Sequence, residues 1–231
     1  MKKILVFFIT AFILLLDSEH CLPQQSITVK AGTRTIDHFP PSVRFRYPEF
    51  IQGKAFFRNS TFTSSRFNYN FLTGNMEFIR SGDTLEIIEP EKIKFIVIDQ
   101  DTFYFSKVYF EVLYSNDFGK LAVNRCFKLV ARKKQAAYGT TSSTSAISSY
   151  NSLSDVSGYY KLEVNDDLVF RMEETYYLHT VKNGFVPFWR KKILQLFPEH
   201  EDKIKAYYKQ YKVDFKNKSD LTGVLQFLNR L

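Results

Sequence analysis

Arg66-Phe-Asn-Tyr-Asn-Phe71 alternates polar and aromatic residues with a period of two. Because successive side chains of a β-strand point to opposite faces, Phe67, Tyr69 and Phe71 share one face and the polar residues share the other. This pattern is typical of a half-buried strand in an antiparallel sheet. The tripeptide Thr73-Gly74-Asn75 that follows predicts a tight turn into the next strand.

The same alternation of β-branched and aromatic residues extends on both sides of this segment, over residues 42–131. Gly, Asn, Asp and Ser interrupt it at short intervals, which is the signature of successive antiparallel strands. The predicted strands are residues 66–71, 76–80, 84–89, 94–98, 103–114 and 121–131.

Residues 135–158 break the pattern, because eleven of their twenty-four positions are Ser or Thr. They have no sustained periodicity, and we predict a long surface loop or linker there. After it, residues 159–164 and 168–172 around an Asn-Asp-Asp turn predict a hairpin, and residues 175–181 predict one more strand.

The periodicity changes to that of helices after Asn183-Gly184. Pro187 suits the first position of one helix, Pro198 opens a second, and Ser219 is the expected cap of a third. In the second helix the spacing of the tyrosines assigns them to the core; they are Tyr207, Tyr208 and Tyr211.

These patterns predict an α+β fold, mainly an antiparallel sheet of the meander or sandwich type, followed by three short C-terminal helices. The expected organisation is a signal peptide at residues 1–21, a β domain at 26–185 that contains the 135–158 loop, and a small helical subdomain at 186–231.

The first residues have the composition of a secretory signal peptide. Lys2 and Lys3 precede a run of thirteen apolar residues, from Ile4 to Leu16, which is too short to cross a bilayer as a helix. We therefore expect an exported protein in the periplasm, at the outer membrane or outside the cell. No transmembrane span is expected after signal cleavage.

The formal net charge of the chain is +8 at pH 7. Export removes nucleic acid from the expected partners, so an anionic glycan, a lipid head group or an envelope protein takes its place. The strongest concentration of charge is in residues 190–231, which hold ten Lys or Arg against five Asp or Glu. The candidate anion-binding residues are Arg190, Lys191, Lys192, Lys205, Lys209 and Lys212. An ordinary solvated helix face accounts for the same pattern.

The sequence contains none of the spaced His, Cys, Ser or Gly motifs that assemble metal, nucleophile or phosphate sites. The catalytic residues therefore stay unknown, and no metal or cofactor is expected. A base at His179 is conceivable, but a histidine on a strand face is usually structural.

The abundant aromatic residues suggest stacking on a ligand. Most are Phe at alternating strand positions, which we assign to the core. The exceptions lie in or beside the Ser/Thr-rich loop and are the candidate stacking residues: Tyr138, Tyr150, Tyr159 and Tyr160.

Three stretches carry a resemblance to a group of proteins. Phe67-Asn-Tyr-Asn with Gly74-Asn-Met-Glu-Phe78, then Ala137-Tyr-Gly139 with Thr144-Ser-Ala-Ile147, and finally Leu196-Phe-Pro198 through Asp220-Leu221 resemble uncharacterised exported β-rich proteins of the Bacteroidota. The resemblance implies a place in the cell envelope and a β-rich fold, and it implies no catalytic residues.

The expected function is that of a non-enzymatic binding or structural module for an anionic or glycan partner. The alternative is an exported hydrolase with its site under the Ser/Thr-rich loop, since long loops often carry function.

Overall fold

The computed structural model describes residues 26–135, 141–145 and 163–231. Within these residues twelve strands form one sheet, in which each paired strand is antiparallel to its neighbour. Helices follow at the C-terminal end. The predicted fold class, a mainly antiparallel α+β fold that ends in three short helices, is confirmed.

The strands are β1 (Ser26–Val29), β2 (Ile51–Phe57), β3 (Phe62–Asn70), β4 (Asn75–Arg80), β5 (Asp83–Glu86), β6 (Ile93–Ile98), β7 (Asp101–Ser106), β8 (Val108–Ser115), β9 (Lys120–Gln135), β10 (Thr141–Ser145), β11 (Asp167–Thr180) and β12 (Gly184–Pro187). The helical elements are η1 (Thr35–His38), α2 (Pro41–Arg44), η2 (Pro90–Lys92), α3 (Arg190–Leu196), η5 (Pro198–His200), α4 (Glu201–Tyr211) and α5 (Lys218–Leu228). Across the sheet the order is β1-β11-β9-β8-β7-β6-β2-β3-β4-β5, with β10 beside β9 and β12 beside β11.

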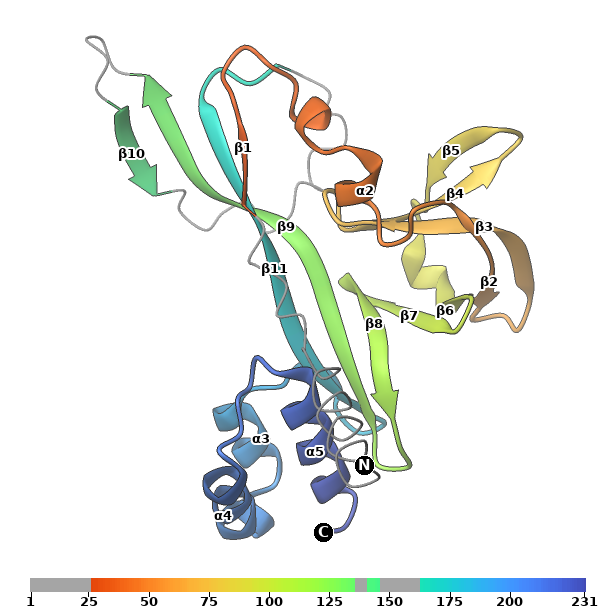
Figure 1. The fold of residues 1–231 in the computed structure, drawn as a ribbon. Helices are drawn as coiled ribbons and strands as arrows, with labels where there is room; N and C mark the ends of the chain where they lie inside the picture. Colours follow the sequence, from red (N-terminus) through yellow and green to blue (C-terminus); the bar gives the residue numbers. More distant parts are fainter. Residues whose placement is uncertain (1–25, 136–140, 146–162) are drawn as a thin grey trace, which may run out of the picture.

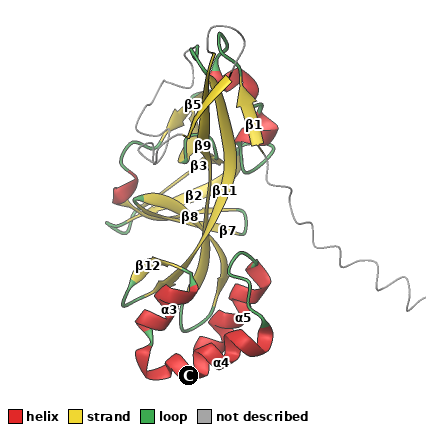
Figure 2. Ribbon diagram, turned by 90° about the vertical axis from the view of Figure 1, so that its left-hand side faces the viewer, coloured by secondary structure: helices red, strands yellow, loops and turns green. Residues whose placement is uncertain are grey.

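The long strands β9 and β11 form the axis of the molecule (Figure 1). The meander of β2 to β8 lies to one side of this ribbon, and β1 pairs with its upper part. Helices α3, α4 and α5 gather at the opposite end of the ribbon (Figure 2). One end of the β9–β11 ribbon therefore pairs with β1, and the other end lies beside the C-terminal helices.

The prediction of one strand over residues 103–114 is wrong. These residues form β7 and β8, which pair through Ser106 and Val108 around Lys107. Lys107 adopts a positive φ of 68°, a conformation usually reserved for Gly or Asn. Because neither of those residues marks the turn, the apolar alternation runs through it without interruption.

The hairpin predicted before residue 175 is also wrong where the structure describes it. Residues 168–172 and 175–180 belong to the single strand β11, which pairs with β9 on one side and, at residues 168–171, with β1 on the other. The two acids in the middle, Glu173 and Glu174, do not break the strand, and Glu174 forms an ion pair with Arg125 on β9. Residues 159–162 lie outside the described part of the chain.

Part of the predicted Ser/Thr-rich loop is a strand. Thr141–Ser145 forms β10 and pairs with residues 131–135 at the end of β9. The two threonines of this segment are β-branched and favour a strand. Residues 136–140 and 146–158 lie outside the described part of the chain.

The three C-terminal helices occur as predicted, but their boundaries differ. Pro187 is the last residue of β12, so α3 starts only at Arg190. The cap of α5 is Asn217, whose side chain accepts hydrogen bonds from the backbone N–H groups of Ser219 and Asp220. An asparagine at this position satisfies helix donors as well as the predicted serine would.

Two apolar cores lie in the part of the sheet away from the C-terminal helices. The first lies under the meander and contains Phe67, Tyr69, Ile96 and Phe103. The second packs the N-terminal segment on the ribbon, where the ring of Phe39 meets those of Phe127 and Phe170 edge to face. Such edge-to-face pairs add to the free energy that burial alone supplies.

A third core joins the helices to the sheet. Leu121 of β9 and Leu178 of β11 are fully buried against apolar side chains of α3, α4 and α5. Ile193, Ile204 and Leu221 represent the three helices in this cluster. The helical segment therefore shares its core with the lower end of the ribbon.

A buried carboxylate ties the N-terminal segment to the sheet. Glu111 on β8 has a side chain that is 7% exposed and lies between two arginines. Arg46 donates to both of its oxygens, at 3.0 and 3.1 Å, and Arg125 donates to one of them at 2.7 Å. Bidentate pairs of this kind fix geometry as well as charge.

The ion network continues outward from the two arginines. Asp101 accepts from Arg46 at 3.2 Å and from the hydroxyl of Tyr47 at 2.6 Å, while Glu174 accepts from Arg125 at 2.6 Å. Burial, with the hydrogen bond to Asp101, raises the pKa of Tyr47. Each carboxylate in the network is paired, so we assign the network a structural role.

A pair of like charges on β4 and β5 is a local weakness. Glu77 and Glu86 are register partners across the two strands. Burial, together with Glu77, raises the pKa of Glu86 above its ordinary value. A carboxyl with a raised pKa costs stability once the pH exceeds that pKa, and the cost disappears as the pH falls below the pKa of the unfolded chain.

Replacing Glu86 by glutamine is therefore expected to raise the free energy of unfolding at pH 7 by up to about 1 kcal/mol, as for other like-charge pairs that face each other across strands. Urea denaturation at pH 7 and below about pH 4 measures the effect, which should vanish in acid. Glu49→Gln, an exposed site without an ion pair among the described residues, is the control. A stabilisation that persists in acid would contradict the explanation.

Candidate functional site

A shallow depression on the helical end contains part of the predicted basic patch. It has a volume of about 530 Å³. Its lining residues come from α3, η5 and the start of α4: Arg190, Lys191, Leu194, Gln195, Pro198 and Glu201. Leu194 and Pro198 give it an apolar component, and the four other side chains are polar or charged. We call this depression the α3–α4 groove.

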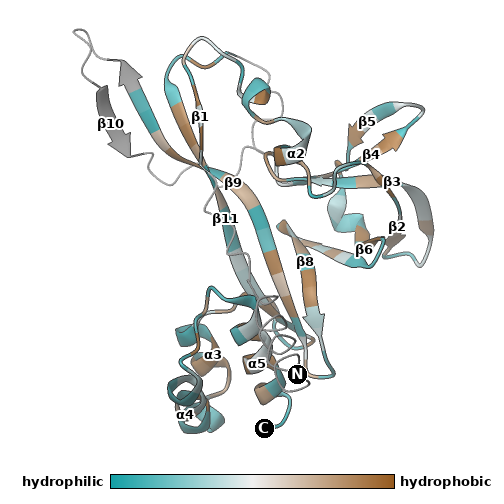
Figure 3. Ribbon diagram, viewed as in Figure 1, coloured by the Kyte–Doolittle hydropathy of each residue, from teal (hydrophilic) through white to brown (hydrophobic). Residues whose placement is uncertain are grey.

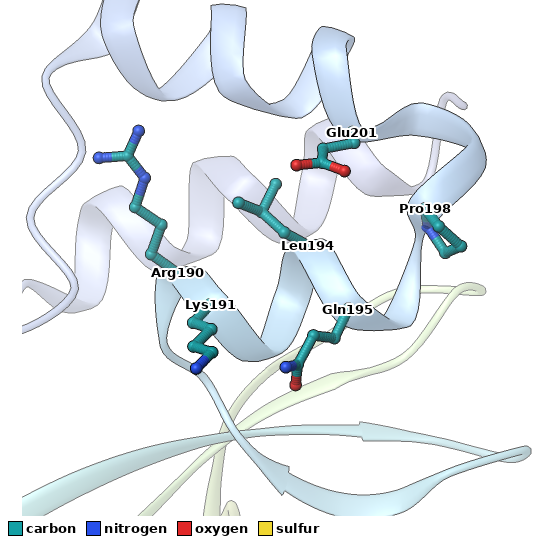
Figure 4. Close-up of a pocket in the computed structure, with 6 residues that line it drawn as sticks. All are labelled: Arg190, Lys191, Leu194, Gln195, Pro198 and Glu201. Atoms are coloured by element: carbon teal, nitrogen blue, oxygen red, sulfur yellow. The ribbon is translucent and has the colours of Figure 1, made fainter.

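Figure 4 shows how these side chains lie. Arg190, Leu194 and Glu201 face the space between the two helices. The side chains of Lys191 and Gln195 project from the opposite side of α3. The groove therefore offers charge on both sides of α3 and is open to solvent.

A lysine one turn along α4 adds a further cation. Lys205 forms an ion pair with Glu201 at 2.6 Å in the i, i+4 arrangement. The hydrogen bond from Lys205 to Glu201 raises the pKa of Lys205, whereas the nearby charge of Arg190 lowers it. Arg190 also lies over the ring of Tyr208, 5.9 Å from its centroid.

The other four predicted anion-binding residues, Lys205 among them, do not line the groove. Lys192 belongs to α3, Lys209 lies one turn beyond Lys205, and Lys212 ends α4 with a left-handed φ of 49°. Of the six, the structure therefore places Arg190 and Lys191 in the groove, and Lys205 is linked to it by the ion pair with Glu201.

The predicted stacking residues cannot be placed. Tyr138, Tyr150, Tyr159 and Tyr160 lie outside the described residues. The core assignment of the helical tyrosines holds for Tyr208, which is buried, but is wrong for Tyr211, which is 59% exposed. Tyr207 is partly buried against the third core, and Tyr211, the last residue of α4, contacts the ring of Tyr207 at 4.5 Å.

Sequence reasoning missed an aromatic surface on the sheet. Several strands carry aromatic residues on both faces, and only one of those faces belongs to a core. On β7, Phe103 is buried under the meander, whereas its neighbour Tyr104 points to the other face and is half-buried. The signal was present in the runs Phe103-Tyr-Phe105 and Tyr176-Tyr177, where consecutive aromatic residues cannot share a face.

Among the described residues, no group of three or more His, Cys, Asp or Glu is placed to hold a metal ion. In the same part of the chain no helix has the length and apolar character needed to cross a membrane. Cys126 is buried and unpaired, and burial raises the pKa of its thiol, so it is a poor nucleophile.

Comparison with known proteins gives no further guide to this site. No protein-family model matches the chain, and no curated protein or solved structure shows significant similarity to it.

Proposed function

We propose that this chain is an exported, non-enzymatic binding protein that holds an acidic glycan of the cell envelope in the α3–α4 groove. The observation that supports the proposal is an open depression lined by Arg190 and Lys191, with Lys205 ion-paired to Glu201 of the same lining. Export rests on the apolar leader of residues 4–16, and the resemblance to envelope proteins of the Bacteroidota agrees with it.

The chemistry of the groove favours a sugar over a simple anion. Arg190 and Lys191 supply donors for a carboxylate, while Gln195 and Glu201 supply an amide and an acceptor for hydroxyl groups. A uronic acid carries both hydroxyls and a carboxylate, and so satisfies both kinds of group.

Retention on immobilised polygalacturonate tests the proposal. Arg190→Gln combined with Lys205→Gln removes two charges and keeps much of the aliphatic stems, so it should weaken retention by at least about fivefold. Lys216→Gln with Lys218→Gln removes the same charge from exposed positions near α5 and should have little effect. Anionic lipid vesicles form the second arm.

If the two double variants were retained equally, the interaction would depend on overall charge and not on the groove, which would contradict the proposal. Tight binding to the vesicles without binding to polygalacturonate would replace the glycan by a lipid head group.

A further inference from the structure

The loop between β2 and β3 contains the tripeptide Asn59-Ser60-Thr61, which has the form Asn-x-Ser/Thr with a residue other than proline in the middle. This is the acceptor pattern for N-linked glycans on exported chains, where it marks a surface loop. All three residues are exposed. Strands β2 and β3 lie in the part of the meander away from the β9–β11 ribbon (Figure 1). The loop is therefore open to a modifying enzyme.

Hydrogen bonds of the backbone define the shape of this loop. The N–H of Phe57 donates to the carbonyl of Thr61 at 2.8 Å, and the N–H of Ser60 donates to the carbonyl of Phe57 at 3.2 Å. Ser60 adopts a positive φ of 67°, which turns the chain back. The side chain of Arg58 donates to the carbonyl of Glu91 at 2.7 Å and fastens the loop to η2. The asparagine is therefore presented on a fixed turn.

The two residues that define the tripeptide contact each other. The backbone N–H of Thr61 donates to Oδ1 of Asn59 at 3.1 Å, and the hydroxyl of Thr61 donates to the same oxygen at 2.7 Å. An asparagine that bonds the backbone two residues further on forms an Asx turn, and here the hydroxyl adds a second donor. Among the described residues, Nδ2 of Asn59 makes no hydrogen bond. The carboxamide thus holds the turn with its oxygen and leaves its nitrogen available for a new bond.

A second tripeptide of the same form, Asn217-Lys218-Ser219, has a different role. Asn217 is the cap of α5, and its Oδ1 accepts from the backbone N–H groups of Ser219 and Asp220. Asn217 is half-buried, and within the described residues the hydroxyl of Ser219 makes no hydrogen bond to it. The helix cap therefore accounts for Asn217. Only the tripeptide in the β2–β3 loop combines exposure with a contact between the asparagine and the hydroxyl group of the pattern.

The surroundings of the loop are compatible with a glycan. Arg58 and Asn59 make the loop hydrophilic, whereas β8 inside the sheet is largely hydrophobic (Figure 3). Phe62, the residue after the tripeptide, is 60% exposed, and Lys54 lies over its ring. A glycan is bulky and solubilising, so at this position it would shield an exposed apolar ring. The α3–α4 groove belongs to the helical end of the molecule and would stay accessible.

We propose that Asn59 is the acceptor of an N-linked glycan, which is added in the compartment into which the leader exports the chain. The donor is an oligosaccharide joined through a diphosphate to a lipid, and a membrane-bound transferase catalyses the step. A bond forms between Nδ2 of Asn59 and the anomeric carbon of the first sugar, and the bond from that carbon to the diphosphate oxygen breaks. Nδ2 loses one proton, and the lipid diphosphate leaves. The proposal rests on export, which is part of the proposed function, and does not depend on the groove.

Secretion of the full chain from cultured insect cells, followed by mass spectrometry of its peptides, tests the proposal. The secreted chain should carry an N-linked glycan on Asn59, which a peptide-N-glycosidase removes. Asn59→Gln and Thr61→Ala, both at exposed positions, should each abolish the modification at this site. Thr61→Ser keeps the hydroxyl and should retain the glycan. Asn217→Gln is the matched control from the other tripeptide, and its Asn59 should be modified as in the unaltered chain.

A second version, with a leader of proven function in place of residues 1–21, separates export from the acceptor site. The proposal is overturned if the secreted chain keeps an unmodified Asn59 with either leader, or if the glycan lies on Asn217 instead. Secretion and a glycan with the replaced leader alone would contradict export, and with it the modification of the native protein. An unmodified Asn59 in the mature protein from its own cells would also overturn the proposal. Asn59→Gln should bind polygalacturonate as the unaltered chain does, so the test of the groove stays independent.

Discussion

Replacing Glu111 by alanine is expected to lower the free energy of unfolding by about 3–5 kcal/mol, as for other buried ion pairs that lose one partner. Glu111 is 7% exposed and pairs with Arg46 and Arg125. Without it, two guanidinium groups remain close together, compensated only by Asp101 and Glu174 at the outer ends of the network. Urea denaturation at pH 7 measures the change.

Glu173→Ala provides the matched control, since Glu173 is an exposed acid on β11 without an ion pair among the described residues. It should change the free energy of unfolding by no more than about 0.5 kcal/mol. A second variant, Glu111→Gln, keeps the shape and tests the charge alone. If Glu111→Ala were as mild as Glu173→Ala, the network would have no stabilising role.

Replacing Leu178 by alanine is expected to cost about 2–5 kcal/mol and to destabilise the sheet and the helices together. Leu178 is fully buried between β11 and the C-terminal helices, so its loss leaves a cavity in the core that both share. Trp189 is the only tryptophan of the chain and lies directly before α3. Its fluorescence reports the helical end, while far-ultraviolet circular dichroism also reports the sheet.

The unfolding transitions followed by fluorescence and by circular dichroism should have the same midpoint urea concentration, both in the unaltered chain and in Leu178→Ala. Val181→Ala, at a fully exposed position just beyond β11, should leave the transition where it was. Separate transitions for fluorescence and circular dichroism would show that the helical segment folds on its own.

The sheet could be predicted because its strands carry a strong period of two. Phe67 and Tyr69 share a buried face as the pattern requires. The pairing of the strands could not be predicted. The turn at Lys107 lacks the residues that usually mark such turns. β11 continues through two acids, and Glu174 pairs there with Arg125 of β9, which is its neighbour in the sheet but distant in the sequence. Both features depend on tertiary context, which a local pattern does not contain.

The candidate sites show the same limit. The basic residues of the C-terminal segment are visible in the sequence, but the depression that Arg190 and Lys191 line together with Glu201 depends on how α3 packs beside the start of α4. Contacts between aromatic side chains of distant strands depend on the curvature of the sheet. Tyr104 on β7 and Phe185 on β12 are four strands apart in the sheet order, and only the folded sheet places their rings 5.9 Å from each other.

Titration of the full chain with oligogalacturonate at low and at high salt tests the central claim, that the α3–α4 groove binds an acidic glycan. Oligogalacturonate should bind at low salt and weaken steeply as salt rises, and the low-salt affinity should fall in the Arg190→Gln, Lys205→Gln variant but not in the Lys216→Gln, Lys218→Gln variant. The claim would be contradicted if oligogalacturonate did not bind at low salt, or if its affinity changed neither with salt nor in the Arg190→Gln, Lys205→Gln variant.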